Sequence, residues 1–489
     1  MNAVANAGMA PVRTAAPARR TPRTAAITNL GCKVNQAEME AAARLLRERG
    51  VTIVDDRSSA DLYLVNTCTV TSVADQKSRQ AVRRARRINP DADLIVAGCS
   101  VQVEPSAFEA AAPGARQVDN RAKDALLAEL AGLAKAGGSG PTDSVPPIRT
   151  ALPTLSGVEL DGAADDRAAP DRTRAFIKVQ DGCSFFCTYC IIPTARGPER
   201  SLPPEAILAD VRRALAAGRR EIVLTGINIG TYDGGWSERG PRGSHARSAL
   251  TLAGLIRRIL AETTVERIRL SSIEPQHVDD DLLAAWTVDG AGRCLPHFHL
   301  PLQSGDDGVL RRMGRRYDSR FYADLVTRIR DAVPGVAIHG DVIVGFPTED
   351  DTAWERSLAF IRSIGFAGLH VFRYSVRPGT AAARMAGHVA EPIRRARSGA
   401  LIAHAAERRA AFAAGRVGST ASVLFETELS DGRWVGHAED HVLVSARPPV
   451  GRSSLTDVIG SVAIESVDPG VSDRLVGRVL PERGGPDGR

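Results

Sequence analysis

The middle of the chain contains the stretch AFIKVQDGCSFFCTYC, which occupies residues 175–190. Its first part, 175–179, is an apolar run of the kind that forms a buried strand. The second part places Cys183, Cys187 and Cys190 in a C-x3-C-x2-C spacing, and thiolates packed this closely suit an iron–sulfur cluster. A [4Fe–4S] cluster takes four ligands, so three thiols would leave one iron open. A zinc site is the alternative, although the usual pairs of C-x2-C or Cys–His spacing are missing.

Further predicted strands follow this stretch, with helical segments between them. They lie at Glu221–Thr225, Arg267–Leu270, His297–Leu300, Val336–Val344 and Leu369–Phe372. Strands that alternate with helices predict a parallel sheet. Six βα units predict a partial (β/α)6 barrel, with the site in the loops at the carboxyl ends of the strands. The cysteine-rich loop follows the first of these strands and belongs to that face.

A separate β/α series precedes this barrel. Three of its predicted strands end directly before Cys32, Cys68 and Cys99. Carboxyl ends of parallel strands meet at one edge of a sheet, so these thiols are expected to converge there. We interpret them as ligands of a second cluster. The alternative is three unrelated core cysteines, because free cysteine is often buried.

The final part of the chain changes pattern. A helical stretch over Ala390–Ala414 precedes short strands broken by Gly, Asp and Pro, which predict a small β-barrel of a nucleic-acid-binding type. Residues 416–480 nevertheless hold six Arg against nine Asp or Glu, so their net charge of −3 makes this barrel a poor general phosphate binder. The expected fold class is α/β with this all-β domain added. The predicted boundaries are 1–23 for a disordered extension, 24–137 for the first α/β domain, 138–168 for a linker, 169–400 for the partial barrel, 401–414 for a connecting helix, 415–480 for the β-barrel and 481–489 for a tail.

Composition limits the class of protein. The chain has 489 residues, a mild formal charge of +6 and seven cysteines whose odd count and wide spacing do not suit a secreted disulfide framework. We see no run of 18 apolar residues and no apolar segment typical of a signal peptide near the N-terminus. These observations predict a cytoplasmic protein that does not enter a membrane. Cys294 has no motif around it and is assigned to packing.

Several longer words carry a family resemblance. They are Asn29–Gln36, Asn66–Thr71, Gly98-Cys99, Ile191–Gly197, Leu224–Asn228, Ser271–Pro275, His299–Gly305 and Asp341–Pro347. Together with the C-x3-C-x2-C loop, these words resemble the radical-SAM methylthiotransferases from Thr24 to about Leu480. The versions at 31–36, 66–71 and 224–227 resemble the branch that modifies N6-threonylcarbamoyladenosine in tRNA. The C-terminal barrel is similar to a TRAM domain.

The resemblance implies a function and its cofactors. Cys183, Cys187 and Cys190 would hold the catalytic [4Fe–4S] cluster, which cleaves S-adenosylmethionine (SAM). Cys32, Cys68 and Cys99 would hold an auxiliary [4Fe–4S] cluster where sulfur is bound and methylated. The methylthio group would be added to C2 of adenosine 37 in the anticodon stem-loop of tRNA, at the expense of two SAM. An electron donor such as flavodoxin or ferredoxin and a sulfur donor would be partners.

Other sites and alternatives stay open at this stage. Gly226, Glu274, Gln303 and Asp341 are the predicted SAM-binding residues, and each could equally be an ordinary loop residue. Arginines 79, 83, 84, 86 and 87 on one helix, and 311, 312, 315 and 316 on another, predict phosphate-binding surfaces or simply solvated helix faces. The target could instead be isopentenyladenosine tRNA or ribosomal protein S12. A non-enzymatic alternative is an RNA-binding iron–sulfur sensor.

Overall fold

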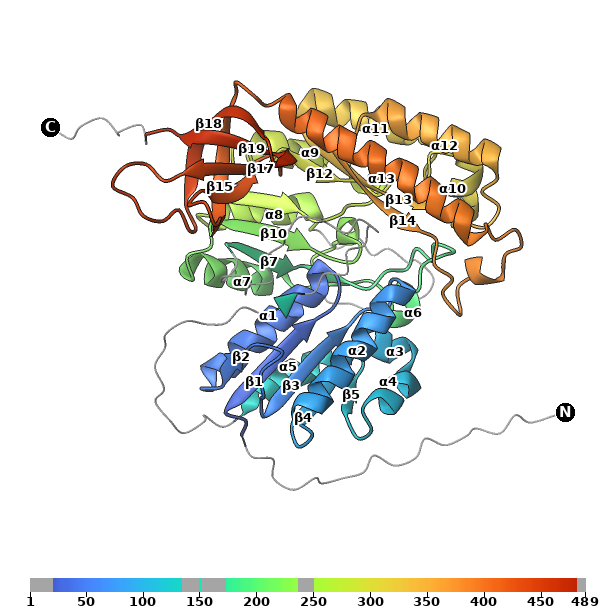
Figure 1. Cartoon of the computed structure of the whole chain (residues 1–489), viewed down its shortest axis with the longest axis vertical. Helices are drawn as coiled ribbons and strands as arrows, with labels where there is room; N and C mark the ends of the chain where they lie inside the picture. The colour runs from blue at the N-terminus through green and yellow to red at the C-terminus, as the bar shows by residue number, and fades with distance from the viewer. Residues whose placement is uncertain (1–20, 134–148, 151–172, 236–249, 482–489) are drawn as a thin grey trace.

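The computed structural model describes residues 21–133, 149–150, 173–235 and 250–481 (Figure 1). Residues 1–20, most of the predicted linker and residues 482–489 lie outside the described residues. The described part has a parallel sheet flanked by helices, a central arc of parallel strands and a closed β-barrel at the C-terminal end. The predicted α/β class with an added all-β barrel is confirmed.

The N-terminal sheet has the strand order β2-β1-β3-β4-β5, and all of its pairs are parallel. These strands are β1 (Thr24–Asn29), β2 (Thr52–Val54), β3 (Leu62–Thr67), β4 (Asp93–Gly98) and β5 (Arg116–Val118), and the short β6 (Arg149–Thr150) also pairs with β1. Two apolar clusters cover the two faces of this sheet. One is formed with α1 (Lys33–Glu48) and α5 (Lys123–Gly132). The other is formed with α2 (Ser72–Ile88) and α4 (Pro105–Ala111).

The central arc consists of two three-stranded parallel sheets, in the orders β11-β10-β7 and β12-β13-β14. Its strands are β7 (Arg174–Lys178), β10 (Glu221–Thr225), β11 (Arg267–Leu270), β12 (His297–His299), β13 (Ala337–Val344) and β14 (Gly368–Arg373). Single parallel bridges, Ile268 to Cys294 and Ser272 to His299, join the two sheets. Six strands therefore form an open arc, which confirms the predicted partial barrel. Cys294 is buried within the apolar core of this arc.

Helices cover the outer face of the arc. The longer ones are α7 (Pro204–Ala216), α8 (Leu252–Glu262), α11 (Ser319–Ala332), α12 (Asp351–Ile364) and α13 (Glu391–Ala414). Local sequence determines where several of them begin, because an aspartate directly before the helix accepts a hydrogen bond from a free amide of the first turn. Asp318 accepts from Phe321 N at 2.8 Å and Asp350 accepts from Ala353 N at 2.7 Å.

The C-terminal barrel closes in the order β15-β16-β17-β19-β18. Its strands are β15 (Thr420–Glu428), β16 (Trp434–Ala438), β17 (Leu443–Arg447), β18 (Ile459–Asp468) and β19 (Val471–Val479). Phe425, Val444, Val462 and Leu475 are among its fully buried core residues. The short strands predicted from the sequence at 421–426, 433–437, 441–444 and 462–464 overlap β15, β16, β17 and β18. The fifth, β19, was not predicted from the sequence.

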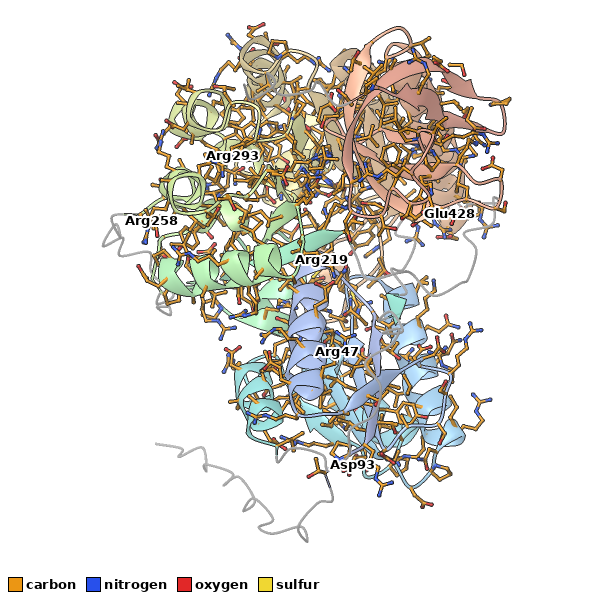
Figure 2. All side chains as sticks on the ribbon, turned by 90° about the vertical axis from the view of Figure 1, so that its left-hand side faces the viewer. Arg47, Asp93, Arg219, Arg258, Arg293 and Glu428 are labelled. Carbon is orange, nitrogen blue, oxygen red and sulfur yellow. The ribbon has the colours of Figure 1, made fainter. Side chains whose placement is uncertain are left out.

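The C-terminal barrel lies against the amino ends of the central strands (Figure 2). Arg269 Nη2 donates to the carbonyl of Ala438 at 3.3 Å, and Arg174 Nε lies 2.9 Å from Glu426 Oε1. The N-terminal sheet contacts the arc elsewhere: Arg377 Nη2, after β14, donates to Thr69 Oγ1 at 2.6 Å, and Lys178 Nζ of β7 lies 2.8 Å from Glu38 Oε1 of α1. Among the described residues, none of the helices combines the length and the apolar character needed to cross a bilayer.

Candidate functional site

The loop that carries Cys183, Cys187 and Cys190, hereafter the first thiol set, begins at a forced turn. Gly182 has φ 72°, and a Cβ there would lie 1.9 Å from the carbonyl oxygen of Pro198. Only glycine accepts this combination of backbone angle and close approach. Asp181 Oδ1 accepts from Gly182 N at 2.8 Å, and Cys183 N donates to Gly197 O at 3.1 Å. The turn therefore sends the thiols across the carboxyl end of β7, as the sequence predicted.

Helix α10 (Asp307–Met313) and the residues after it hold the far side of this loop. Thr188 N donates to Met313 O at 2.9 Å. Arg315, which is almost completely buried, donates from Nη1 to Cys187 Sγ and to Tyr189 Oη, both at 3.4 Å. The same guanidinium pairs with the carboxylate of Glu274. Arg315 thus fixes a thiol, an aromatic side chain and a carboxylate relative to one another.

Hydrogen-bond donors and burial both affect the protonation of the first thiol set and its ability to bind a metal. Asn228 Nδ2 lies 3.9 Å from Cys183 Sγ, a distance at which an amide donor can contact sulfur. Burial raises the pKa of the Cys183 and Cys190 thiols to about 12. Without a cation these thiols would be protonated at neutral pH, and a bound metal would have to displace their protons. Half-buried free thiols on one short loop, with polar donors beside them, fit iron–sulfur ligation.

Cys32, Cys68 and Cys99, the second thiol set, lie at the carboxyl ends of three adjacent strands, β1, β3 and β4. Cys32 directly precedes α1, and Cys99 is the first residue of α3 (Cys99–Val103). Cys68 and Cys99 are buried, whereas Cys32 is accessible although surrounding protein desolvates its thiol. The structure places these three thiols at one edge of the sheet, as the sequence predicted.

Two glycines make this convergence possible. Gly31 has φ 149°, and a Cβ there would lie 2.4 Å from Asn35 Nδ2 and 3.3 Å from Cys68 Cβ. Gly98 has φ 110°, and a Cβ there would lie 2.4 Å from Thr67 O. Side chains at either position would push the neighbouring strand ends apart. The glycines before Cys32 and Cys99 therefore bring the thiols close together.

The spacing of both thiol sets argues against a single zinc ion. A zinc with Zn–S bonds of about 2.3 Å keeps its ligand sulfurs about 3.8 Å apart. Among the described residues, the groups whose ligand atoms all lie within 4.8 Å of one another are His297/His339/His441 and His299/Asp341/His370. Neither contains a cysteine. Thiols that share a site at wider spacing fit a polynuclear cluster better than one metal ion.

Asn120 links the two thiol sets directly. Its Nδ2 atom lies 3.5 Å from Cys99 Sγ and donates to the carbonyl of Ala195 at 2.6 Å. Ala195 lies in α6 (Ile192–Arg196), the helix that follows the first thiol set. One side chain therefore contacts a thiol of the second set and the helix next to the first. The two sets lie on facing edges of one junction.

A buried ionic network holds this junction together, and we call its members Glu38, Lys123, Lys178, Asp181 and Arg196 the junction network. Arg196 is completely buried and reaches Asp181 Oδ1 at 2.7 Å and Glu38 Oε1 at 3.2 Å. Lys123 and Lys178 contact the same Glu38 carboxylate at 2.6 and 2.8 Å. Three cations thus surround two carboxylates. The excess positive charge favours an anionic group such as a thiolate-ligated cluster close by.

The pKa values follow from this crowding. Burial alone would raise the pKa of Glu38, but Lys123, Lys178 and Arg196 hold it well below its usual range. Asp181 is affected in the same way by Arg196 and Lys178, so its pKa is also lowered. Burial raises the pKa of the Cys32 thiol, and the charge of Arg196 opposes this rise. Both carboxylates stay ionised at neutral pH and keep the cations of the network in place.

The predicted SAM-binding residues occupy different environments. Glu274 lies beside the first thiol set through its pair with Arg315. Gly226 packs against Gln180, since a Cβ there would lie 2.9 Å from Gln180 Oε1. Gln303 has φ 69°, and its N–H donates to the carbonyl of Asp341 at 2.7 Å. The packing against Gln180 gives Gly226 a structural reason, and a role in binding SAM stays a prediction for all four residues.

The side chain of Asp341 accepts two imidazole contacts. His299 Nε2 lies 2.8 Å and His370 Nδ1 lies 3.1 Å from the same oxygen, Asp341 Oδ1. Burial would raise the pKa of Asp341, but these two histidines hold it low. The carboxylate is therefore ionised and already hydrogen-bonded within the arc.

The two arginine runs behave differently from a uniform phosphate surface. Arg84 pairs with the buried Asp56, and Arg86 donates to the carbonyls of Pro90 and Ala92. In the second run Arg315 is buried at Cys187, and the Arg316 guanidinium lies 4.0 Å from the ring centre of Phe185. Several members of both runs thus have structural partners.

Replacing Arg315 by methionine is expected to slow reductive SAM cleavage by about tenfold or more, the scale of losing one charge-assisted hydrogen bond. The change removes the donor to Cys187 Sγ and leaves the Glu274 carboxylate without its cation. Loss of a donor to a ligand sulfur also lowers the reduction potential of an iron–sulfur cluster. Anaerobic potentiometry followed by EPR measures this. The exposed Arg311, replaced in the same way, is the control, and an unchanged potential in Arg315→Met would contradict the assigned contact.

Comparison with known proteins places this geometry in a family. Residues 177–361 match the Radical SAM superfamily, and residues 24–118 match a family described as uncharacterized protein family UPF0004. The threonylcarbamoyladenosine tRNA methylthiotransferase MtaB of Bacillus subtilis is 38% identical over 78% of this chain and 80% of its own length. The chain belongs to the radical-SAM tRNA methylthiotransferase family. The resemblance inferred from the sequence is confirmed.

This radical-SAM tRNA methylthiotransferase also has relatives that are named for a second activity. A tRNA-2-methylthio-N(6)-dimethylallyladenosine synthase of Novosphingobium aromaticivorans is 33% identical over 94% of this chain and 99% of its own length. A solved structure, the radical S-adenosylmethionine methyltransferase TsrM of Kitasatospora setae, covers 74% of each chain with a TM-score of 0.49 and 14% identity. The protein is a radical-SAM enzyme, and the cofactors of its family are SAM and two [4Fe–4S] clusters.

Several contact residues were missed by sequence reasoning. They are Gln180, Asn120, Arg196, Asn228 and Arg315. Gln180 Nε2 donates to Gly182 O at 2.8 Å, and its Oε1 accepts from Asn228 N at 2.8 Å, so it ties the first thiol set to the loop after β10. Arg196 and Asn228 do lie inside words quoted for the family resemblance. Gln180 lies in the stretch 175–190 and Arg315 in one of the arginine runs, but neither was assigned the contact that it makes, and Asn120 has no local signal.

Proposed function

We propose that the enzyme adds a methylthio group to C2 of N6-threonylcarbamoyladenosine at position 37 of tRNA. The single observation that carries this proposal is the link through Asn120, which brings two separate three-thiol sets to one junction. A methylthiotransferase needs one site for cleaving SAM and another for holding sulfur. The Bacillus subtilis relative is named as a threonylcarbamoyladenosine tRNA methylthiotransferase, which supports the threonylcarbamoyl branch.

The first thiol set would hold the cluster that cleaves SAM, and the second thiol set would hold the auxiliary cluster. The chemistry supplied when clusters and SAM are bound is one-electron cleavage of SAM and transfer of a methylated sulfur to carbon. The chain itself orients and desolvates these groups. Arg315 fixes Cys187, Gln180 fixes the loop turn, and the junction network keeps the facing edges in register. Burial of the junction would exclude water from a reactive carbon-centred species.

Glu274, Gly226, Gln303 and Asp341 remain the residues we propose for SAM binding. The anticodon stem-loop of tRNA would be the macromolecular substrate, with an electron donor such as flavodoxin or ferredoxin and a separate sulfur donor as partners. We place this activity in the cytoplasm, where tRNA is modified. The predicted residue boundaries of the three domains are kept as proposals.

Mass spectrometry of tRNA nucleosides tests the substrate. A strain that lacks this gene is expected to lose the 2-methylthio derivative of threonylcarbamoyladenosine, while the unmodified threonylcarbamoyl nucleoside accumulates. Restoring the gene should reverse both changes. Loss of the methylthio derivative of isopentenyladenosine instead would assign to this enzyme the activity for which the Novosphingobium relative is named. An unchanged nucleoside profile with altered ribosomal protein S12 would move the target to protein.

A further inference from the structure

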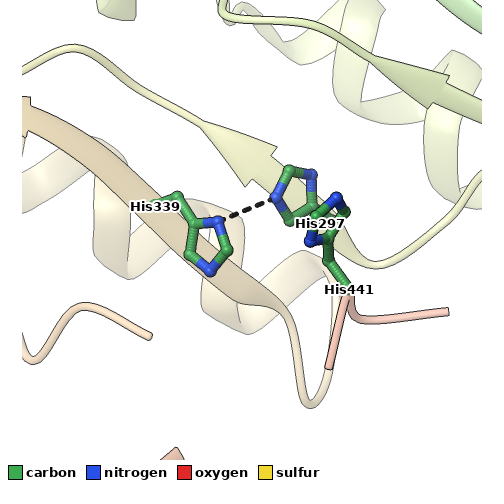
Figure 3. Close-up of side chains that lie close together, drawn as sticks. All are labelled: His297, His339 and His441. Atoms are coloured by element: carbon green, nitrogen blue, oxygen red, sulfur yellow. Dashed lines mark hydrogen bonds between the residues drawn. The ribbon is translucent and has the colours of Figure 1, made fainter. Parts of the chain in front are cut away.

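Three histidines meet where the C-terminal barrel contacts the central arc (Figure 3). His297 lies in β12, His339 lies in β13, and His441 lies between β16 and β17. One ring nitrogen from each lies within 4.8 Å of the others. His297 Nε2 and His339 Nδ1 are 3.1 Å apart, and the His297 and His441 rings stack with centroids 4.8 Å apart. The cluster thus joins segments from two structural units.

Burial favours the neutral form of all three imidazoles. Burial lowers the pKa of His297, His339 and His441 well below the usual range, and the neighbouring histidines and Arg269 lower it further. Neutral imidazole is the form that binds metal ions. His297 Nδ1 is in addition buried with no hydrogen-bond partner. Such an unsatisfied polar atom is costly in a protein interior, so the cluster as it stands is incomplete.

The backbone accommodates this cluster at two strained or crowded positions. His441 has φ 72°, a left-handed conformation that few residues other than glycine, Asn and Asp adopt. Opposite His339 in the sheet lies Gly368, where a Cβ would be 3.1 Å from Cδ2 and Nε2 of the His339 ring. Backbone strain of this kind persists where surrounding structure or function requires it. Both features keep imidazoles in contact with each other.

We propose that His297, His339 and His441 bind a divalent transition metal such as Zn²⁺, which fastens the C-terminal barrel to the central arc. Zinc with Zn–N bonds of about 2.0–2.1 Å keeps its nitrogens about 3.4 Å apart, close to the 3.1 Å between the rings of His297 and His339. Imidazole ligands suit zinc, copper, iron and nickel. A water molecule or another small donor would complete the tetrahedron.

The surrounding charges permit a dication. Arg269 is a fixed cation that acts on all three histidines, and its Nε lies 3.0 Å from the buried carboxylate of Glu221. Lys33 also acts on His297, and burial lowers its own pKa to about 8. On the other side of the cluster, His437 Nδ1 lies 3.1 Å from Glu426 Oε2. The positive side chains next to the site are therefore balanced by carboxylates or easily deprotonated.

The neighbouring triad of His299, Asp341 and His370 is a weaker candidate. Its carboxylate oxygen already accepts both imidazoles, at 2.8 and 3.1 Å, so the three groups satisfy one another. His370 is exposed, with 55% of its side-chain surface accessible. Asp341 also belongs to the residues proposed for SAM binding. This triad therefore serves as the internal control for the three-histidine site.

The test uses the full-length protein with both iron–sulfur clusters reconstituted anaerobically, so that the cysteines are occupied. Zn²⁺ is added against a competing chelator, and zinc and iron are quantified after desalting. We expect a single tightly bound zinc per chain in addition to the iron. His441→Asn, whose side chain tolerates the left-handed backbone, and His339→Gln should weaken zinc binding by about 100-fold or more, beyond the 10–100-fold typical of losing a residue that only supports a ligand. His370→Asn should bind zinc as the unaltered protein does.

Zinc K-edge X-ray absorption of the unaltered protein gives a second readout that does not depend on any variant folding. The expected spectrum has only light scatterers at about 2.0–2.1 Å, with imidazole features. Sulfur at about 2.3 Å would assign the zinc to cysteines and overturn the proposal. Equal zinc binding by the unaltered protein, His441→Asn and His339→Gln would overturn it as well, and so would a loss confined to His370→Asn or an absence of tight binding.

Discussion

Cys187→Ala is expected to lose SAM cleavage by about 10⁴-fold or more, the scale of removing an essential catalytic group. Cys187 is the thiol whose sulfur accepts the N–H of Arg315, so its removal takes away a ligand and leaves a buried guanidinium without one of its partners. The second thiol set lies on different strands and should keep its cluster. Iron per chain should therefore fall by about half, because one of two [4Fe–4S] clusters is lost.

The measurements are iron content, the EPR spectrum of the reduced protein and the amount of 5′-deoxyadenosine formed from SAM. Cys294→Ala is the matched control, because Cys294 is also a free cysteine but lies buried in the core of the arc, away from both thiol sets. The control should retain all iron and normal cleavage. SAM cleavage at an unaltered rate by Cys187→Ala under anaerobic, reducing conditions would remove Cys187 from the proposed role.

Cys68→Ala is expected to separate the two halves of the reaction. Cys68 is buried at the end of β3, and burial raises the pKa of its thiol to about 12. Its removal should empty the second thiol set while the first set, which is held by α10 and Arg315, stays intact. Formation of 5′-deoxyadenosine should continue at a similar rate. The methylthio product should fall by about 10³-fold or more, as expected for loss of an essential group.

Both products can be measured in one reaction that contains tRNA bearing threonylcarbamoyladenosine. The ratio of methylthio nucleoside to 5′-deoxyadenosine is the informative quantity, because a general loss of folded protein lowers both products together. A normal ratio in Cys68→Ala would show that sulfur transfer does not need the second thiol set. A parallel loss of both products in this variant, with iron still present at the first set, would contradict the separation of roles.

Much of the fold could be predicted because short segments of the sequence determine where its strands and helices begin and end. Strands β10 and β11 coincide with the predicted Glu221–Thr225 and Arg267–Leu270, because each is a short segment with buried apolar residues between two helical segments. The end of β1 and the start of α1 were visible from Gly31-Cys32. β19 was missed because polar and charged residues interrupt its apolar positions, and its buried side chains, such as Leu475, point into a closed barrel rather than a wide core.

The thiols could be predicted and their supporting residues could not, for a physical reason. Cysteine is rare, and its spacing or its place after a strand is visible along the chain. Arg315 and Cys187 are 128 positions apart, and Arg196 and Asn35 are 161 apart. Nothing in a single sequence indicates which of many arginines pairs with which distant group. The same holds for the three histidines, which lie on separate segments of two units and share no local spacing.

The junction network has a consequence for building chimeric enzymes. Its members come from both the N-terminal sheet and the central arc, with Glu38 on α1 and Arg196 on α6. Exchange of one unit between relatives that act on different adenosines would keep these ion pairs only if both parents carry matching charges at positions 38, 178, 181 and 196. The natural unit of exchange is therefore the N-terminal sheet together with β7 and the loop and helix that follow it. Substrate preference could then be transplanted without separating the two thiol sets.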